Sequence, residues 1–356
     1  MDATETVQGQ VFNRHYTVNL TLEPLQEYFD DPQVTEIRFN RPGQVVCQTH
    51  TGKQIIDRPD LDWNYLGRLR QTLIHTNRLD DDPVVNVILP NGARGIICMP
   101  PAVIEGSILV AFRKHSAVVK TLEQLDAEGA FADWRNVSFN QPTPDEAAER
   151  MNRRDFQRLD EDEVELLGLL RERDLVGFFR RAVQTKRNIV IAGKTGSGKT
   201  TLNRTFLLEV PASERIITIE DVHELFLREE QSEEGHLLYG KPEEGRMSVS
   251  DCLAACMRLS PDRIFLAELR DSAALEYLEG LNNGHPGSIT TTHAGSALMT
   301  FNRIVTLIRK SEAGRLLDVN DIMRELYTTI DITVFMHERK IKEVFYDPIF
   351  KRERLG

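Results

Sequence analysis

The eight residues 193–200, GKTGSGKT, constrain the fold of this chain more than any other feature. They match the pattern G-x-x-x-x-G-K-[S/T], which average residue usage produces by chance in on the order of one chain in a hundred of this length. The apolar run NIVIA (188–192) precedes the pattern, and the helical sequence TLNRTFLLEV (201–210) follows it. A glycine-rich loop between a buried strand and a helix lets backbone N–H groups wrap a phosphate at the positive end of the helix dipole. The sequence therefore predicts a phosphate-binding loop.

Two side chains at the end of this loop suit a nucleoside triphosphate. Lys199 supplies a positive charge to the β- and γ-phosphates, and the hydroxyl of Thr200 can ligate Mg²⁺. We therefore expect ATP and Mg²⁺ as cofactors. The residues expected to bind the nucleotide are Gly193, Lys194, Thr195, Gly196, Ser197, Gly198, Lys199, Thr200 and Thr201.

From about residue 166 onward, short apolar strands alternate with helical segments. The strands are NIVIA (188–192), RIITIE (215–220), RIFLAE (263–268), SITTTH (288–293) and ITVFM (332–336). This alternation is typical of a mainly parallel sheet in an α/β layer fold. Ligands of such folds bind at the carboxyl ends of the strands, where we expect the motifs below to lie.

One carboxylate ends the predicted strand RIFLAE. Glu268 comes directly after apolar residues, so it is expected to emerge at the carboxyl end of the strand and to face the phosphate loop. That position suits a carboxylate that orients the attacking water, or an outer-shell partner of magnesium. In many phosphate-loop proteins an Asp at the end of this strand helps to hold Mg²⁺. Here the residue before Glu268 is Ala267, so we expect Thr200, the phosphates and water to hold Mg²⁺. The alternative, that Glu268 only pairs with Arg270 or caps a helix, stays open.

Further acids lie at the end of the predicted strand RIITIE and just after it. Glu220 ends the strand, Asp221 comes next, and Glu224 is close behind. An extra strand between the phosphate-loop strand and the Glu268 strand marks the P-loop folds that use a separate catalytic glutamate. We expect Glu220 to be catalytic and the other two acids to support it, although each of them could instead cap the next segment.

Polar residues flank the strand SITTTH. Thr292 and His293 end it, and His285 lies in the GHPG sequence (284–287) that enters it. A lone histidine is usually a hydrogen-bonded core residue. Two histidines that bracket a strand among nucleotide-binding neighbours favour a function, and we expect these three residues to sense the γ-phosphate.

The part before the phosphate loop has a different pattern. Residues 1–135 read as a smaller α+β domain, with strands at 34–40, 44–50, 84–90, 93–99 and 107–113, a helix over about 60–77 capped by Asp60 or Asp62, and a two-residue hairpin turn at Asn91-Gly92. Residues 136–165 are polar and carry dense mixed charge, which indicates an interdomain linker. Residues 166–356 form the α/β domain.

Composition excludes several classes of protein. With 40% hydrophobic and 28% charged residues, the chain has enough apolar mass for packed cores and is not disordered. A net charge of −11 argues against a large basic surface, so no direct sequence-specific nucleic-acid binding is expected. No stretch reaches the ~20 apolar residues that span a bilayer. The four cysteines form no CxxC pair, so we expect a reduced, cytoplasmic protein without a structural zinc module.

Four motifs in this order resemble those of the secretion traffic ATPases that drive type II secretion, type IV secretion and pili. The family's Walker A, Asp box, Walker B and His box correspond to GKTGSGKT (193–200), IITIEDVHEL (216–225), RLSPDRIFLAELR (258–270) and GLNNGHPGSITTTHAGS (280–296). The N-terminal part resembles the VirB-type, conjugative branch of type IV secretion through LEPLQEYFDDPQVTEIRFNRPG (22–43), LPNGARGIICMPP (89–101) and VAFRKHS (110–116). The resemblance covers nearly the whole chain. Ala267, where the family usually has Gly, is a small departure.

The resemblance implies a RecA-like P-loop ATPase domain preceded by a smaller α+β N-terminal domain. It also implies a homohexamer, peripheral to the cytoplasmic face of the bacterial inner membrane, with the type IV secretion channel and coupling-protein ATPases as partners. ATP hydrolysis in such a ring powers substrate translocation or assembly of the secretion system. The N-terminal domains are expected to close over the nucleotide, with Arg113 contacting phosphate and Arg94 as a less specific match.

Three other functions use the same motifs. One is a pilus-retraction or type II secretion motor, although the pilus and type II extension motors often carry a four-cysteine zinc module that this chain lacks. Another is a nucleotide-gated docking platform with little turnover, which the intact Lys199, Thr200 and Glu268 disfavour. The third is a P-loop kinase, for which the N-terminal domain offers no acceptor-binding lid. Basic residues at Arg171, Arg173, Arg180, Arg181, Lys186 and Arg187 form a solvated helix face or contact anionic lipid or neighbouring subunits.

Overall fold

The computed structural model describes residues 16–49, 52–114, 119–225, 234–240, 246–270, 273–282 and 284–355. The chain divides into two compact units, Met1–Val118 and Val119–Gly356, and each is described by itself. This division lies before the boundary at 135/136 that composition suggests. Residues 115 and 116 of the VAFRKHS sequence lie outside the described residues.

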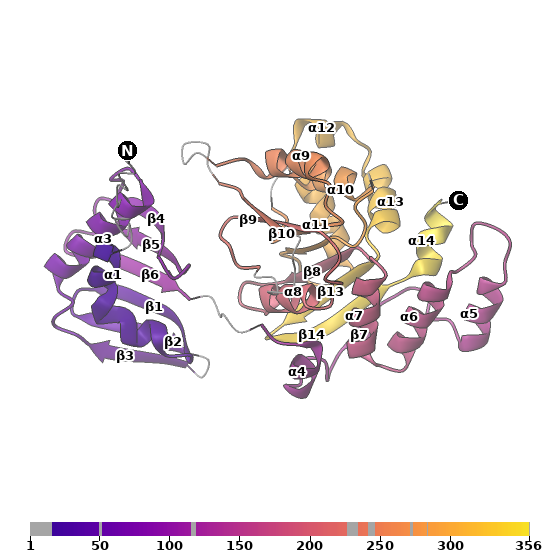
Figure 1. The fold of residues 1–356 in the computed structure, drawn as a ribbon, viewed down its shortest axis with the longest axis horizontal. Helices are drawn as coiled ribbons and strands as arrows, with labels where there is room; N and C mark the ends of the chain where they lie inside the picture. Colours follow the sequence, from indigo (N-terminus) through magenta and orange to yellow (C-terminus); the bar gives the residue numbers. More distant parts are fainter. Residues whose placement is uncertain are drawn as a thin grey trace, which may run out of the picture. The chain divides into compact units, whose positions relative to one another are not determined.

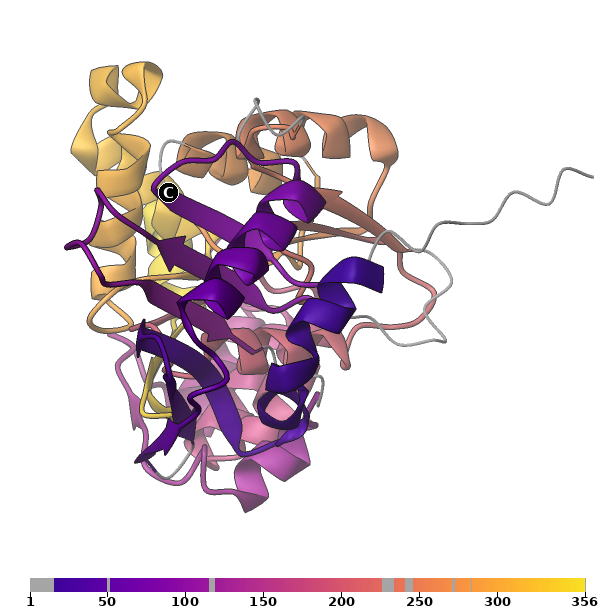
Figure 2. The same ribbon diagram turned by 90° about the vertical axis from the view of Figure 1, so that its left-hand side faces the viewer.

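The first unit is an antiparallel sheet with helices on one face. The strands run in the order β3-β2-β1-β6-β5-β4, and every neighbouring pair is antiparallel. They are β1 (Val34–Arg41), β2 (Gln44–Thr49), β3 (Gly52–Asp57), β4 (Val84–Ile88), β5 (Arg94–Cys98) and β6 (Leu109–Arg113). The helices are α1 (Tyr16–Leu22), the 3₁₀ helix η1 (Glu23–Leu25), α2 (Gln26–Asp30) and α3 (Trp63–Asn77). Helices α1 and α3 lie across one face of the sheet (Figure 2) and share a hydrophobic core with it.

Local signals in this unit are confirmed with one adjustment. Asp62 caps α3, because its carboxylate accepts the N–H of Tyr65 at 2.8 Å. Strands β4 and β5 form the expected hairpin, but the backbone N–H of Leu89 donates to the carbonyl of Ala93, so residues 90–92 form a three-residue turn. Gly92, at φ 79°, takes the left-handed position that such a turn requires.

The second unit is built on an eight-stranded sheet in the order β10-β9-β11-β12-β8-β13-β14-β7. The strands are β7 (Arg135–Asn136), β8 (Ile189–Gly193), β9 (Ile216–Glu220), β10 (Glu234–Leu238), β11 (Arg263–Leu266), β12 (Ile289–Thr292), β13 (Ile332–His337) and β14 (Lys340–Tyr346). Strands β8 to β13 are all parallel, and only β14 runs antiparallel to its neighbour β13. The mainly parallel sheet predicted from the alternating pattern is confirmed.

The order of the central strands decides which side chains meet. Strand β12 lies between the phosphate-loop strand β8 and strand β11, which leads to Glu268. Strand β9, which ends in Glu220, lies beyond β11. The strand inserted beside the phosphate loop is therefore the one that leads to His293, and Glu220 lies one strand farther from the loop than Glu268.

Helices cover both faces of this sheet (Figure 1). One face packs against α4 (Leu122–Ala127), α6 (Glu161–Arg171), α7 (Leu175–Gln184), α8 (Lys199–Leu207) and α14 (Pro348–Leu355). The other face packs against α9 (Val249–Leu259), α10 (Ala274–Asn282), α11 (Met299–Ile308) and α13 (Val319–Thr329), and α12 (Glu312–Leu316) follows α11. Alternate strand residues enter opposite cores, since Ile189 and Ile191 face the first group and Val190 faces the second.

The segment expected to link two domains belongs to the second unit. Strand β7 pairs in parallel with β14, and the hydroxyl of Ser138 donates to the carbonyl of Tyr346 at 2.8 Å. Helix α5 (Pro144–Met151) follows with a capping box formed by Thr143 and Glu146. The polarity of residues 136–165 does not predict this position, because the segment is anchored by the pairing of β7 with a distant strand and by ring contacts of Phe139 with Phe345 and Phe350.

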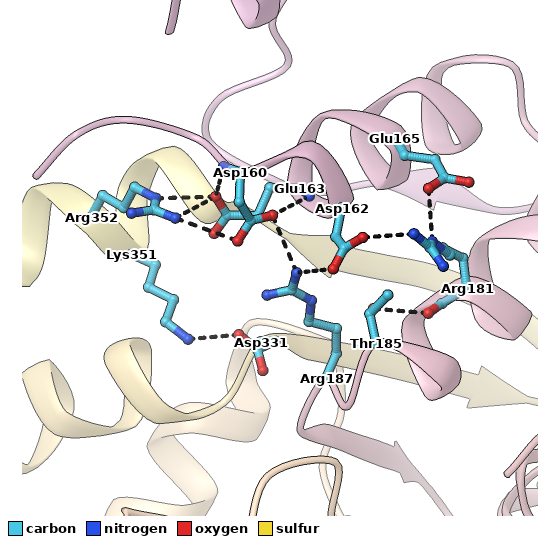
Figure 3. Close-up of polar contacts among 10 residues, drawn as sticks. All are labelled: Asp160, Asp162, Glu163, Glu165, Arg181, Thr185, Arg187, Asp331, Lys351 and Arg352. Carbon is cyan, nitrogen blue, oxygen red and sulfur yellow. Dashed lines mark hydrogen bonds and ion pairs between the residues drawn. The ribbon is translucent and has the colours of Figure 1, made fainter. Parts of the chain in front are cut away.

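Ion pairs tie α6 to the remainder of this unit (Figure 3). Arg352 of α14 contacts the buried Glu163, and Lys351 lies 2.6 Å from Asp331. Four of the six residues of the basic cluster in the sequence are paired in the same way: Arg180 contacts Glu123 and Glu209, Arg181 contacts Asp162 and Glu165, Lys186 contacts Glu214 and Asp262, and Arg187 contacts Asp160 and Asp162. This pairing favours a structural role for the cluster.

No helix within the described ranges combines the length and the apolar character needed to cross a bilayer.

Candidate functional site

The phosphate loop joins strand β8 to helix α8 and depends on its glycines. Gly193, Gly196 and Gly198 all have positive φ, at 155°, 76° and 98°. A Cβ on Gly193 would lie 2.4 Å from the hydroxyl oxygen of Ser197 and 2.5 Å from the carbonyl oxygen of Met336. Side chains are therefore excluded at the first position of the loop, which leaves a concave backbone of the kind that phosphate requires.

The turn between β13 and β14 packs against the phosphate loop. The backbone N–H of Arg339 donates to the carbonyl of Ser197 at 3.1 Å. A Cβ on Gly198 would lie 3.2 Å from the terminal methyl of Met336. Sequence reasoning missed this contact because nothing in the chain's pattern connects residues 336–339 with residues 193–198.

Lys199 begins α8 and is buried, with 8% of its surface exposed. Its ammonium group donates to the carbonyls of Gly193 at 2.9 Å and Lys194 at 3.1 Å. The charge therefore lies against the concave backbone of the loop. Thr200 is exposed beside it in the first turn of the helix, and Thr201 follows.

Glu268 lies just beyond the carboxyl end of β11. Its carboxylate is mostly buried, and one of its oxygens, Oε2, accepts a hydrogen bond from Arg270. Burial alone would raise the pKa of Glu268, but the hydrogen bond and charge of Arg270, with the charges of His293 and Lys199, hold it below its ordinary value. The other oxygen, Oε1, is buried and accepts no hydrogen bond from any residue that the structure describes.

His293 connects Glu268 with the phosphate loop. Its Nδ1 lies 3.1 Å from the carbonyl oxygen of Gly193, and its Nε2 lies 3.1 Å from Oε1 of Glu268. A carbonyl oxygen only accepts, so Nδ1 is the donor in the first contact. The second contact has the distance of an ion pair without the geometry of a hydrogen bond, so Oε1 keeps its capacity to accept. The structure thus brings Lys199, Glu268 and His293 together.

Arg270 links Glu268 to the acids that follow β9. One guanidinium nitrogen contacts Glu268, and another lies 3.7 Å from the carboxylate of Asp221. These two carboxylates raise the pKa of Arg270, so it stays charged. The sequence indicates Arg270 only as a possible partner of Glu268, and its contact with Asp221 follows from the adjacency of β9 and β11.

Glu220 is completely buried, and its own surroundings use its oxygens. The backbone N–H groups of Glu224 and Leu225 donate to Oε2 at 2.6 and 2.7 Å. The hydroxyl of Thr218 donates to Oε1 at 2.8 Å, and Nδ1 of His223 lies 3.1 Å from the same atom. Burial alone would raise the pKa of Glu220, but hydrogen bonds from His236, His223 and the two backbone groups lower it to about 2.

Two other predicted residues have local partners. Thr292 is fully buried, and its hydroxyl donates to the carbonyl of Leu269 at 3.2 Å. His285 precedes the amino end of β12, and its Nδ1 lies 3.0 Å from the carbonyl oxygen of Pro261. The phosphate loop follows the carboxyl end of the parallel strand β8, so the structure does not bring His285 together with the loop.

Arg94 and Arg113 belong to the first unit. They are direct neighbours across β5 and β6, and Glu36 lies opposite Arg113 on β1. All three lie on the sheet face opposite their buried neighbours Ile37, Gly95 and Phe112, because successive residues in a strand alternate between faces. The two arginines therefore form a basic pair on one face of the sheet.

The family model for "Type II/IV secretion system protein" matches residues 144–334, which is more than half of the chain. This range holds the phosphate loop, Glu220, Glu268 and His293.

Curated relatives extend the match to nearly the full length. "Type IV secretion system protein VirB11" of Brucella suis is 39% identical over 353 residues, which cover 95% of this chain and 92% of the relative. The protein of the same description from Bartonella quintana is 37% identical over 344 residues, with 94% of each chain covered.

Solved structures support the fold. The VirB11 ATPase from the Brucella suis type IV secretion system, in complex with sulphate, is 38% identical with a TM-score of 0.53, and the match covers 96% of this chain and 98% of that one. The pilus retraction motor PilT with bound ADP is 19% identical with a TM-score of 0.59, covering 94% and 86%, and at that identity it shows a shared fold only. The chain therefore belongs to the type II/IV secretion system family, and it is a type IV secretion ATPase.

Proposed function

We propose that this ATPase binds ATP with Mg²⁺ on the phosphate loop and that Glu268 orients the attacking water. The observation that carries the proposal is the state of the Glu268 carboxylate. It is mostly buried and its pKa is lowered, so it is charged, and among the described residues its Oε1 accepts no hydrogen bond although it lies beside the loop. A charged oxygen with free accepting capacity is what a water-positioning group needs.

The remaining residues of the site position the phosphates and the carboxylate. Lys199 places its charge at the β- and γ-phosphates, and the loop N–H groups hold their oxygens. The concave backbone at Gly193 fits a phosphate, and the Thr200 hydroxyl is exposed beside it to ligate Mg²⁺, which neutralises charge on the phosphates when bound. His293 keeps Glu268 in contact with the loop and responds to the γ-phosphate.

Glu220, Asp221 and Glu224 have a positioning role in this proposal. The carboxylate of Glu220 fixes the backbone of residues 224 and 225, and this holds the segment that carries Asp221. Asp221 in turn faces Arg270, the partner of Glu268. Thr292 supports the same region through its bond to Leu269.

At the level of the assembly, the protein acts as a homohexamer on the cytoplasmic face of the inner membrane. Its partners are the type IV secretion channel and coupling-protein ATPases, and hydrolysis powers substrate translocation or assembly of the system. The descriptions of the relatives as type IV secretion system proteins support this assignment. Arg113, with Arg94, contributes positive charge to the phosphates, and the basic pair on β5 and β6 supports that role.

The test of the catalytic assignment is the variant Lys199→Ala. We expect phosphate release to fall below a tenth of wild type and nucleotide affinity to weaken, because the loop loses its buried charge. Lys342→Ala is the matched control, since among the described residues this lysine pairs with the exposed Asp133, and its loss is expected to leave turnover unchanged. Turnover of Lys199→Ala above a tenth of wild type would contradict the assignment, and negligible turnover of the wild type would favour a docking platform.

The role of Arg113 has its own test. Arg113→Ala is expected to reduce phosphate release sharply while the unfolding midpoint stays close to that of wild type, because the side chain is exposed at the end of its strand. An arginine that contacts the transferred phosphate contributes about 10³–10⁵ in rate. Unchanged turnover would remove Arg113 from the site.

A further inference from the structure

Three side chains around the carboxyl end of β9 have the composition of a transition-metal site. They are Glu220, His223 and His236, and they come from β9, the segment after it, and the neighbouring strand β10. Each residue offers one ligand atom, and these atoms all lie within 4.8 Å of one another. Two imidazoles and a carboxylate are an N₂O donor set, which suits Zn²⁺ and similar ions better than Mg²⁺ or Ca²⁺.

The distances centre on one oxygen. Oε1 of Glu220 lies 3.1 Å from Nδ1 of His223 and 3.8 Å from Nδ1 of His236. The two imidazole rings are in an edge-on arrangement with centroids 4.3 Å apart. Tetrahedral zinc with bonds of about 2.0–2.2 Å places its ligand atoms roughly 3.4 Å from one another. Small side-chain movements therefore bring all three atoms to ligating distance.

Surrounding groups orient these ligands. The N–H groups of Glu224 and Leu225 hold Oε2 of Glu220, which directs Oε1 toward the imidazoles. Nε2 of His236 lies 3.8 Å from the carboxylate of Glu234, which holds the ring with Nδ1 toward Glu220, and Nδ1 exchanges its 2.7 Å contact with the hydroxyl of Thr218 for the ion when one binds. Hydrogen-bonding groups that fix ligand orientation in this way are typical of protein metal sites.

Burial and charge also fit a cation. The Glu220 side chain is fully buried, and a buried carboxylate needs a positively charged partner. His223 and His236 keep 37% and 26% of their side chains exposed, so an ion and a water ligand can reach them. The ion would join β9 to the edge strand β10 on the side of the sheet away from β8.

We propose that Glu220, His223 and His236 bind one divalent transition-metal ion of the zinc class, with water as a further ligand. The site is separate from the Mg²⁺ expected on Thr200, because β11 and β12 lie between β9 and the phosphate-loop strand. Its role is structural, since it holds the segment that carries Asp221. The proposal does not depend on Glu268 or on turnover.

Equilibrium dialysis of the full-length chain against Zn²⁺, in the presence of excess Mg²⁺, tests the site. We expect one Zn²⁺ per chain, and Co²⁺ in its place should give the strong visible absorption of a tetrahedral complex. Loss of one protein ligand in His236→Asn is expected to weaken Zn²⁺ binding by about 100-fold or more. His337→Asn is the matched control, because His337 lies near the carboxylate of Glu338 and belongs to no group of three possible metal ligands within the described ranges.

A second variant guards against a local folding defect. His223→Asn is expected to weaken binding to a similar extent, and each variant is checked by its unfolding midpoint without metal and by nucleotide binding. The proposal is overturned if the wild-type protein retains no Zn²⁺, or if both histidine variants retain as much Zn²⁺ as the wild type. In that case protons alone satisfy the cluster, with the imidazoles acting as cationic donors to Glu220.

Discussion

The ends of the two adjacent strands β9 and β11 look alike in sequence and differ in structure. Both strands are mainly apolar, and each leads to a glutamate: Glu220 is the last residue of β9, and Glu268 lies two residues beyond β11. At β9 the carboxylate is fully buried, and both its oxygens accept hydrogen bonds from nearby groups. At β11 one oxygen is held by Arg270, and the other accepts no hydrogen bond from the described residues.

The difference follows from what surrounds each strand end. After Glu220 the chain turns back, so that its N–H groups reach the carboxylate and fix it in the protein. After Glu268 the chain leads to Arg270, and the neighbouring strand β12 leads to His293, which faces the phosphate loop. A glutamate whose hydrogen bonds are used by the protein stabilises structure, whereas one with an oxygen to spare can act on water.

The largest expected effect is in catalysis at β11. Glu268→Gln keeps the size and much of the hydrogen bonding of the side chain but removes its charge. We expect hydrolysis to fall by about 10²-fold or more, the scale of a positioned acid–base group, while ATP still binds. Phosphate release and nucleotide affinity measured on the same preparation check this, and an equal loss of both would make Glu268 structural like Glu220.

The next largest effect is in stability at β9. The Glu220 pKa is about 2 in the folded chain against an ordinary 4.5, so its ionised form stabilises the fold above pH 4.5. A difference of this size is worth on the order of 3 kcal/mol, which is lost as the pH falls from about 4.5 to about 2. Glu220→Gln is therefore expected to be less stable than wild type at neutral pH, with a difference that narrows in acid.

His236 adds a second pH dependence to the stability, at higher pH than that of Glu220. The hydrogen bond to Glu220 raises the pKa of His236 above its ordinary 6.5. The stability that protonated His236 contributes is present below pH 6.5 and is lost as the pH rises through the raised pKa. Urea unfolding of the metal-free protein at several pH values checks both pH ranges, with the exposed Glu338→Gln as the control. Parallel pH curves for wild type and Glu220→Gln would contradict the assignment of the buried carboxylate to stability.

Sequence reasoning predicted the phosphate loop and the parallel sheet because both depend on contiguous residues. The loop pattern and the apolar strand before it lie within 188–200, and local sterics determine their conformation. The same reasoning could not separate Glu220 from Glu268, because strand order in the sheet decides which end faces the loop. It also placed His285 with His293, although the two lie at opposite ends of a strand whose residues 289–292 separate them.

The compact units divide before the boundary that composition suggests, and the reason is related. Composition marks residues 136–165 as polar, yet β7 joins the large sheet by pairing with β14, a strand about 200 residues later in the sequence. Backbone pairing leaves no signature in the composition of so short a strand. The ion pairs of Asp160 and Glu163 with α14 likewise join segments that are distant in the sequence (Figure 3).

The smallest expected effect concerns Arg270, which contacts both regions. Arg270→Gln removes a charge that helps to lower the pKa of Glu268, so that pKa is expected to rise. The acid limb of the pH–rate profile then moves to higher pH, and turnover at neutral pH falls by about tenfold as the carboxylate loses its orientation. Arg270→Lys keeps the charge and is expected to restore the position of the limb better than the rate, because a lysine cannot bridge Glu268 and Asp221 in the same planar geometry. A lower rate with an unmoved limb in Arg270→Gln would mean that Arg270 only packs against the site, and Glu268 would then owe its charge to Lys199 and His293.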